Sequence, residues 1–284
     1  MNQKLSPQSV ALVTGASSGF GLLVSVALAR GGYRVVASMR NMENKETLET
    51  AAREAGVWEQ IEVVPLDVTN FAAAESVVHD VINHYGQIDV LVNNAGFAVG
   101  GFVEELSLEE WERQFATNFF GLVAVTKAVL PVMRKQRSGK IINISSISGR
   151  IGFPSMGPYV ASKFAVEGFS ESLRLEMLPY GVYVVLIEPG SYKTNIWSKG
   201  LQGVSIRSNS PYAKEMKTIL QYVKRVAKTA PPPDEVIEHI VKVAQSPTPS
   251  LRYPVGRGVK LMLRLKNWLP WKRWERIVMK QFHK

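Results

Sequence analysis

The stretch VALVTGASSGFG, Val10 to Gly21, decides the fold of this chain. Its first four residues are a short apolar run typical of a buried parallel strand, and a helical stretch, Leu22 to Arg30, follows the last glycine. Glycines at a turn from strand to helix let the backbone approach a pyrophosphate, whose charge then faces the helix N-terminus. A glycine-rich turn can also be only a tight loop. Its place between a strand and a helix favours a dinucleotide site.

Strands and helices alternate along the rest of the chain. The expected strands are 10–14, 34–39, 61–66, 89–93, 140–145 and 182–188, with a seventh near 251–255. Helical patterns lie at 20–30, 43–55, 71–85, 108–136, 158–179 and, after a run of three prolines, at 234–245. This alternation predicts an α/β fold, a doubly wound parallel sheet with right-handed crossovers. We expect one domain over 1–256 and a C-terminal extension over 257–284.

Composition agrees with one large globular domain. The chain has 284 residues, 46% of them apolar and 20% charged. It has no cysteine, so disulfides, a thiol nucleophile and a thiolate metal site are excluded. Residues 1–7 lack the apolar core of a signal peptide, and no apolar run approaches the ~20 residues that span a membrane. We therefore expect a cytoplasmic protein.

A tyrosine and a lysine are spaced to share one face of a helix. Tyr159 and Lys163 are four residues apart, and Ser146, after an apolar run, lies thirteen residues before the tyrosine. A free phenol, with a pKa near ~10, is a poor proton donor or acceptor at neutral pH, and a nearby positive charge lowers that pKa. The three side chains together predict a site that moves a proton at a carbonyl or alcohol oxygen. A YxxxK pair alone can arise by chance.

These motifs together resemble the short-chain dehydrogenase/reductase family over about residues 8–195. The resemblance rests on the order and spacing of TGASSGFG (14–21), NNAG (93–96), Ser146 with Tyr159 and Lys163, and Pro189-Gly190. It implies a one-domain Rossmann fold that uses NAD or NADP to oxidise alcohols or reduce carbonyls. The string YVASKFAVEGF (159–169), with Arg40, looks like members that act on hydroxysteroids, retinoids or related lipophilic carbonyls.

The residue after the second strand bears on the choice of cofactor. NAD sites of this kind usually place an acid there for the ribose 2′-hydroxyl, but this chain has Arg40 and no acid before Glu43. An arginine can pair with a 2′-phosphate, which a carboxylate would repel. Arg40 therefore favours NADP over NAD. Some NADP-using members also carry a basic residue in the glycine turn, where this chain has Ser17 and Ser18. Alternatively, Arg40 is only a solvated surface arginine.

The resemblance implies further cofactor contacts, position by position. Asp67 matches an acid that bonds the adenine amino group, although it could instead cap a helix. Asn94 matches a turn beside the adenosine ribose, although it could simply stabilise the end of the sheet. Thr194 matches a threonine that holds the nicotinamide carboxamide. The full expected set is Gly15, Ser17, Ser18, Gly19, Phe20, Gly21, Arg40, Asp67, Val68, Asn94, Ala95, Gly96, Tyr159, Lys163, Pro189, Gly190 and Thr194.

The resemblance also implies catalytic roles. Tyr159 donates the proton in reduction and accepts it in oxidation, and Ser146 donates a hydrogen bond to the reacting oxygen. Lys163 holds the nicotinamide-ribose hydroxyls and, together with the charge of the oxidised ring, lowers the tyrosine pKa. Ser146 and Tyr159 thereby also contact the substrate. Asn118 matches an asparagine that anchors a water in a proton relay, or else satisfies a bend in its helix. We expect no metal, because the four histidines show no metal-ligand spacing.

Substrate recognition is expected in 195–228, which forms a variable helical lid in this family. Its apolar and aromatic residues suit a hydrophobic alcohol or carbonyl, steroid-, retinoid- or lipid-like or xenobiotic, or they pack onto the core. They are Ile196, Trp197, Leu201, Tyr212, Met216, Leu220 and Tyr222. The predicted function is an NADP(H)-dependent oxidoreductase. The alternative is a non-catalytic dinucleotide-binding sensor or scaffold, recruited to membranes by its tail.

The tail from Arg257 onward holds nine basic residues against one acid, Glu275. The rest of the chain is nearly balanced in charge, which argues against nucleic-acid binding. Trp268, Trp271 and Trp274 lie among these cations, with Pro270 expected to split the tail into two helices. The tail either packs on the catalytic domain as a lid or dimer contact, or lies on an anionic membrane. The resemblance implies a homo-oligomer paired through 108–136 and 158–179.

Overall fold

A seven-stranded parallel sheet forms the centre of the protein in a computed structural model, which describes residues 8–194 and 210–282. The strand order is β3-β2-β1-β4-β5-β6-β7, and every neighbouring pair is parallel. The strands are β1 (Val10–Thr14), β2 (Arg34–Met39), β3 (Ile61–Pro65), β4 (Val90–Asn93), β5 (Gly139–Ile144), β6 (Val182–Pro189) and β7 (Arg252–Val255). All seven expected strands are present, and the doubly wound Rossmann fold is confirmed.

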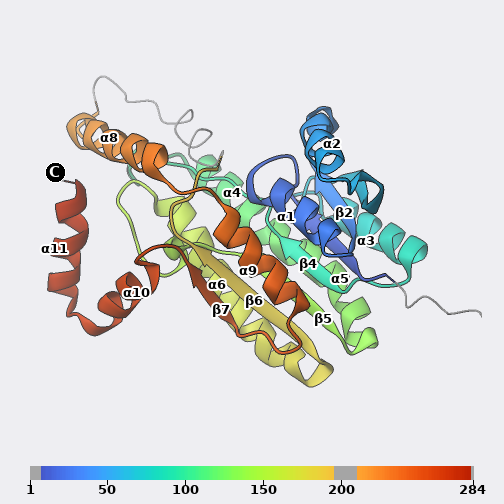
Figure 1. The fold of residues 1–284 in the computed structure, drawn as a ribbon. Coiled ribbons are helices and arrows are strands. Elements are labelled where there is room, and N and C mark those ends of the chain that lie inside the picture. Colours follow the sequence, from blue (N-terminus) through green and yellow to red (C-terminus); the bar gives the residue numbers. More distant parts are fainter. Residues whose placement is uncertain (1–7, 195–209, 283–284) are drawn as a thin grey trace, which may run out of the picture.

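Helices cover both faces of the sheet, because the strands are apolar on both sides (Figure 1). On one face, side chains of α1 (Gly19–Arg30), α2 (Lys45–Glu54) and α9 (Asp234–Gln245) pack against the sheet. On the other face lie α3 (Phe71–Tyr85), α5 (Leu122–Gln136) and α6 (Gly157–Met177). Short helices η1 (Met42–Asn44), η2 (Trp58–Gln60), η4 (Ile147–Gly149) and η5 (Leu178–Tyr180) complete the connections.

The chain reverses its direction of travel across the sheet between β1 and β4. β1 leads to β2 and β3 on one side, and β4 then pairs with β1 on its other side. In open parallel sheets, ligands bind outside the carboxyl ends of the strands at such a switch point. The glycine turn follows β1 and the Asn94 turn follows β4, so the topology brings both expected cofactor segments to this crevice.

The expected helix 108–136 is interrupted. It consists of α4 (Leu108–Phe115), a π-helical segment η3 (Ala116–Gly121) and α5. Among the described residues, Leu108–Gln136 is the one helical stretch long and apolar enough to cross a membrane by length and composition alone, with an 18-residue window of mean hydropathy 1.5. In this fold its apolar side chains Val125, Val129 and Met133 are buried against the sheet, so they belong to the core.

Three further helices lie beyond the sheet, toward its β7 end (Figure 1). They are α8 (Ala213–Thr229), α10 (Val259–Trp268) and α11 (Trp271–Phe282). Pro270 separates the last two, as the sequence predicts. Val259 and Leu263 of α10 and Trp274 of α11 are buried in a small cluster with Ile151. The extension therefore packs on the rest of the protein through one of its faces.

Candidate active site

The glycine turn after β1 is held closely against the turn after β4. Gly15 has φ +69, and a Cβ there would lie 2.8 Å from the Cα of Ala95. The Asn94 Nδ2 donates to the carbonyl oxygens of Thr14 (2.9 Å) and Gly15 (3.0 Å). A Cβ on Gly21 would lie 2.4 Å from that same Nδ2. Glycine is therefore required sterically at both positions, and Asn94 does stabilise the sheet end, as its alternative interpretation proposed.

The N-terminus of α1 is suited to a phosphate. Ser18 is the N-cap residue, and within the described chain its side chain makes no capping hydrogen bond. Gly19 has φ +59, and the nearest atom to a Cβ placed there is the Thr194 Cβ at 3.9 Å. Backbone N–H groups at an uncapped helix start, beside glycines that leave space, form a site for a negatively charged group. These residues fit the pyrophosphate of a dinucleotide.

The predicted nicotinamide segment lies beside this turn. The Gly190 N–H donates to the Val255 carbonyl (2.9 Å), which fixes the segment to the end of β7. The ring of Tyr192 meets that of Phe20 edge-on, with centroids 6.2 Å apart. Pro189, Gly190 and Thr194 are therefore placed at the same edge of the sheet as the glycine turn.

Two predicted adenosine contacts follow β2 and β3. Arg40 is exposed, and it forms no ion pair or hydrogen bond with any residue in the described ranges. The Asp67 Oδ1 accepts from the Thr69 N–H (3.0 Å) and hydroxyl (2.7 Å). The helix-cap alternative for Asp67 is wrong, because Asn70 caps α3 by accepting from the Ala73 N–H (3.1 Å).

The three residues expected to move a proton come together where β5 and α6 meet. Ser146 follows β5, and its Oγ accepts from the Ser148 N–H at 3.1 Å. That bond leaves the serine hydrogen free to be donated, and Ser146 is close enough to the Tyr159 hydroxyl to lower the pKa of the phenol. Lys163 lies one turn after Tyr159 on α6, with its Nζ 5.8 Å from the centroid of the tyrosine ring. Each of the three side chains is buried.

Burial changes the expected acidity of this group. The pKa of Tyr159 is raised above its ordinary value, because burial disfavours the phenolate, while the hydrogen bond from Ser146 opposes the rise. The expectation of a lowered tyrosine pKa is wrong for the protein alone, since desolvation of the phenol dominates. Burial also lowers the pKa of Lys163 to about 8, against the attraction of Glu167. The Lys163 ammonium donates to the Ile144 carbonyl at 2.7 Å.

Asn118 lies in the π-helical segment, and the side-chain amide is fully engaged. Its Oδ1 accepts from the Phe97 N–H (3.0 Å), and its Nδ2 donates to the Phe97 carbonyl (2.9 Å) and the Ser162 hydroxyl (3.3 Å). A Cβ on Gly96 would lie 3.1 Å from that Oδ1. Asn118 thereby holds the NNAG turn against α6. These bonds run to Phe97 and to α6, and not to the backbone of the helix that carries Asn118, and the water relay stays a prediction.

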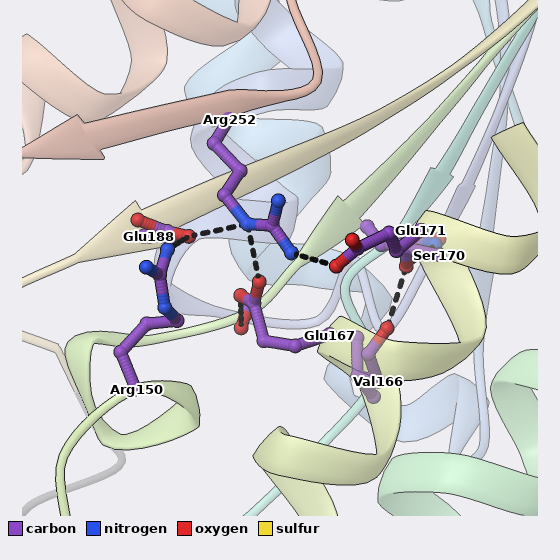
Figure 2. A network of polar contacts seen from close by, with 9 residues as sticks. Arg150, Val166, Glu167, Ser170, Glu171, Glu188 and Arg252 are labelled. Atoms are coloured by element: carbon purple, nitrogen blue, oxygen red, sulfur yellow. Dashed lines mark hydrogen bonds and ion pairs between the residues drawn. The ribbon is translucent and has the colours of Figure 1, made fainter.

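A network of two buried acids and two half-buried arginines links α6, β6 and β7 with the segment after β5 (Figure 2). The Glu167 Oε1 accepts from the Ser145 hydroxyl (2.6 Å), and its Oε2 pairs with the Arg252 Nε (3.0 Å). The Glu188 Oε1 pairs with the Arg150 Nη1 (3.1 Å) and lies 3.4 Å from the Arg252 Nε. Sequence reasoning assigned no role to this network. Two signals were present: Glu167 is four residues after Lys163, and Glu188 is an acid inside an apolar strand.

The lid region is described only from residue 210 onward. Ile196, Trp197 and Leu201 lie outside the described residues. In α8, Met216 is buried, and Tyr212, the N-cap residue of this helix, stacks on Phe102 with ring centroids 4.3 Å apart. The Tyr212 hydroxyl also donates to Glu104. These contacts join α8 to the loop after β4, and Leu220 and Tyr222 are half-buried on the same helix.

Known sequences similar to this chain include a family model and several oxidoreductases. Residues 9–203 match the short chain dehydrogenase family. An uncharacterized oxidoreductase of Bacillus subtilis, YusZ, is 47% identical over 99% of each chain. A 3-ketodihydrosphingosine reductase of Bacteroides thetaiotaomicron is 38% identical over 94% of each chain. Human retinol dehydrogenase 8 is 40% identical over 87% of this chain and 81% of its own.

Solved structures share the fold over nearly the whole chain. A short chain dehydrogenase/reductase of Burkholderia phymatum in complex with NAD has a TM-score of 0.79 and 25% identity, covering 92% of this chain and 93% of its own. An actinorhodin polyketide ketoreductase with NADPH has a TM-score of 0.76 and 34% identity, covering 89% and 97%. With these relatives, and with the glycine turn and the Ser146, Tyr159 and Lys163 group in their expected places, this chain belongs to the short-chain dehydrogenase family of oxidoreductases and is similar to its retinol dehydrogenase-like members.

Proposed function

We propose that the protein is an NADP(H)-dependent oxidoreductase that acts on the alcohol or carbonyl group of a hydrophobic substrate. The observation that carries this proposal is the meeting of Ser146, Tyr159 and Lys163 at the carboxyl edge of the sheet, the edge that also carries the glycine turn. A sensor that only binds a dinucleotide has no need of a buried phenol, hydroxyl and ammonium in one group. We therefore favour the enzyme over the sensor alternative.

The protein's own residues divide the proton chemistry between them. The bound cofactor supplies or accepts the hydride at its nicotinamide ring. Tyr159 donates the proton to the carbonyl oxygen during reduction and accepts it during oxidation. The hydroxyl hydrogen of Ser146 is directed to that same oxygen as negative charge develops on it. Lys163 would hold the ribose hydroxyls of the cofactor, and its ammonium would favour the ionised form of the phenol, against the effect of burial.

The choice of NADP rests on the surroundings of Arg40. Its guanidinium is exposed after β2, without an ionic partner among the residues described, and no acid stands in the position that NAD sites use. The related ketoreductase structure contains NADPH, while the Burkholderia relative contains NAD. The local charge at Arg40 decides our proposal for this chain.

Two similar proteins support a lipophilic substrate. Their names give retinol and 3-ketodihydrosphingosine as substrates, and both molecules carry the reacting oxygen on a long apolar skeleton. We propose a steroid-, retinoid- or lipid-like alcohol or carbonyl, or a xenobiotic of similar character. Met216 and Ile219 give α8 an apolar inner side consistent with such a ligand.

Assembly and location follow the same resemblance. We propose a cytoplasmic homo-oligomer paired through α5 and α6. Large apolar side chains are exposed on or beside those helices, namely Phe120, Phe164 and Leu175. Sedimentation equilibrium of the wild type and a Leu175→Glu variant would test the pairing, since a charge in the interface would lower the mass.

The deciding experiment measures NADPH oxidation with a panel of hydrophobic aldehydes and ketones, using Tyr159→Phe as the comparison. Loss of the phenolic proton should lower kcat by roughly 10²–10⁴-fold while NADPH still binds. Equal turnover by the variant would reject the tyrosine mechanism. NADPH binding without turnover on any member of the panel would favour the sensor.

A further inference from the structure

The helix α10 has an apolar stripe on each of two opposite sides. Val259 and Leu263 are buried against the catalytic domain. Leu261, Leu265 and Trp268 follow one another at spacings of four and three residues, on the far side of the helix. They are 61%, 41% and 88% exposed. A helix on the surface of a soluble protein ordinarily has one apolar stripe and a polar outer face. The outer face of α10 is apolar instead.

The neighbouring helix α11 is basic on its outer face. Trp274 is buried on the inner side, whereas Lys272, Arg273, Arg276 and Lys280 are exposed at helical spacing. None of these four cations forms an ion pair with a residue in 8–194 or 210–282. Trp271, 66% exposed, lies at the corner between the two helices. Figure 1 shows α10 and α11 as a bent pair at the outer end of the molecule, beyond β7.

We propose that the outer faces of α10 and α11 form a docking surface for an anionic lipid membrane. Aliphatic and tryptophan side chains enter the boundary between headgroups and acyl chains, while lysine and arginine attract the negative lipid surface. Each basic residue near such a surface strengthens binding by about fivefold. The two helices together provide both requirements.

The charge of the surface argues against the other occupants. A second copy paired by two-fold symmetry would bring the same cations against each other, with Glu275 as the one acid to offset them. A nucleic acid would satisfy the cations but would leave the aliphatic side chains of Leu261 and Leu265 in water. A membrane with anionic headgroups accommodates both the charge and the apolar stripe.

The inner face of the same pair contacts the segment that links Ser146 to Tyr159. Ile151 is buried with Trp274, and Ile147 and Phe153 pack against that cluster. The Lys266 ammonium also donates to the carbonyl oxygen of Arg150. The contacts of α10 and α11 with this segment would therefore hold the catalytic part of the molecule at the lipid surface. Docking of this kind needs no membrane-spanning segment.

Cosedimentation of the full chain with vesicles tests the proposal, independently of any turnover. The wild type should bind vesicles of phosphatidylcholine mixed with phosphatidylglycerol, with a blue shift in tryptophan emission, and should bind pure phosphatidylcholine much more weakly. One variant removes the stripe (Leu261→Ser, Leu265→Ser, Trp268→Ser) and another removes charge (Lys272→Gln, Arg273→Gln, Arg276→Gln). Loss of three cations should weaken binding to mixed vesicles by about a hundredfold, and loss of the stripe by at least about tenfold.

A matched control replaces two exposed apolar residues elsewhere, Phe71→Ser with Leu108→Ser, and should bind like the wild type. Thermal unfolding checks that each variant is folded, and the single Trp268→Ser change replaces the triple variant if that one unfolds. The proposal is overturned if the wild type ignores mixed vesicles, or if the stripe variant binds them unchanged. A third outcome also overturns it: the wild type does not bind vesicles, and the stripe variant has a lower oligomeric mass than the wild type. A second copy of the chain would then cover the surface.

Discussion

At the scale of single residues, Glu188 is a buried acid in which, within the described chain, only one of the two side-chain oxygens has a polar partner. Its side chain is fully buried, and one oxygen pairs with Arg150 and lies near Arg252. The other oxygen, Oε2, has no hydrogen-bond partner among the residues described. Burial, followed by repulsion from Glu167, raises the pKa of Glu188 from 4.5 to about 7. A buried acid of this kind lowers stability when it ionises.

We expect Glu188 to make the stability of the protein fall as pH rises from about 4.5 to about 7. In this window the folded protein keeps a proton that the unfolded chain has released, so raising the pH favours unfolding. Glu188→Gln removes that contribution. Urea unfolding at several pH values should show the variant gaining stability relative to the wild type across the window. A difference that stays constant with pH would contradict the raised pKa.

Arg40 should determine cofactor preference through one contact. Replacing Arg40 with alanine removes a charge-assisted hydrogen bond to the 2′-phosphate. Such a bond contributes about 1.5–3 kcal/mol to the binding free energy, or roughly 10–150-fold in affinity. Titration calorimetry of Arg40→Ala should therefore show weaker binding of NADPH and unchanged binding of NADH. Arg30→Ala, another exposed arginine at the end of α1, is the matched control and should change neither. An equal loss for both cofactors would show that Arg40 does not read the phosphate.

At the scale of elements, η4 packs against α6 with no space for an added methyl group. A Cβ on Gly149 would lie 2.8 Å from the Ser145 Oγ, 2.9 Å from the Glu167 Cγ and 3.0 Å from the Lys163 carbonyl oxygen. The carbonyl is part of a helix and cannot move aside. The short helix after Ser146 and the helix that carries Lys163 are therefore positioned by a glycine.

Gly149→Ala should cost about 1–3 kcal/mol of stability, because overpacking displaces η4 from α6. It should also lower kcat, since the same displacement moves Ser146 relative to Tyr159. Gly168→Ala is the matched control: Gly168 lies inside α6 with no atom within 4 Å of its added Cβ, so the variant should gain about 0.5–1 kcal/mol. Denaturant unfolding and steady-state kinetics measure both effects. A Gly149→Ala variant as stable and active as the wild type would show that η4 can shift freely.

The elements were largely predictable because their signals are local. Strands such as Val90–Asn93 consist mainly of consecutive apolar residues, and Pro270 and the prolines before Asp234 mark helix boundaries within a few residues. A bend at Asn118 was one alternative from the sequence, but the π-helical form of η3 was not predictable, because it accompanies the bonds of Asn118 to Phe97 and Ser162, which are distant in sequence. Asp67 and Asn70 are both suitable N-cap residues for α3, and only the backbone geometry shows that Asn70 is the cap.

At the scale of the whole molecule, the site was predictable where its chemistry follows spacing along the chain. The glycine turn and the Tyr159–Lys163 pair are such cases. The raised pKa of Tyr159 was not predictable from the sequence, because the burial of the phenol depends on the packing of distant segments. The same holds for the network of Arg150, Glu188 and Arg252, which come from three separate parts of the sequence.

The C-terminal extension should therefore behave as part of the catalytic unit. Trp274 is buried against Ile151, in the segment between Ser146 and Tyr159. Trp274→Ala should cost about 3–5 kcal/mol of stability and lower kcat, because the cavity releases that segment. Trp271→Ala, three residues away and exposed, should change stability by about 0.5 kcal/mol or less and leave kcat unaltered. Calorimetric unfolding with kinetics on one soluble substrate measures both. If Trp274→Ala loses stability but keeps full kcat, the extension stabilises the fold without positioning the site, and its link to catalysis is rejected.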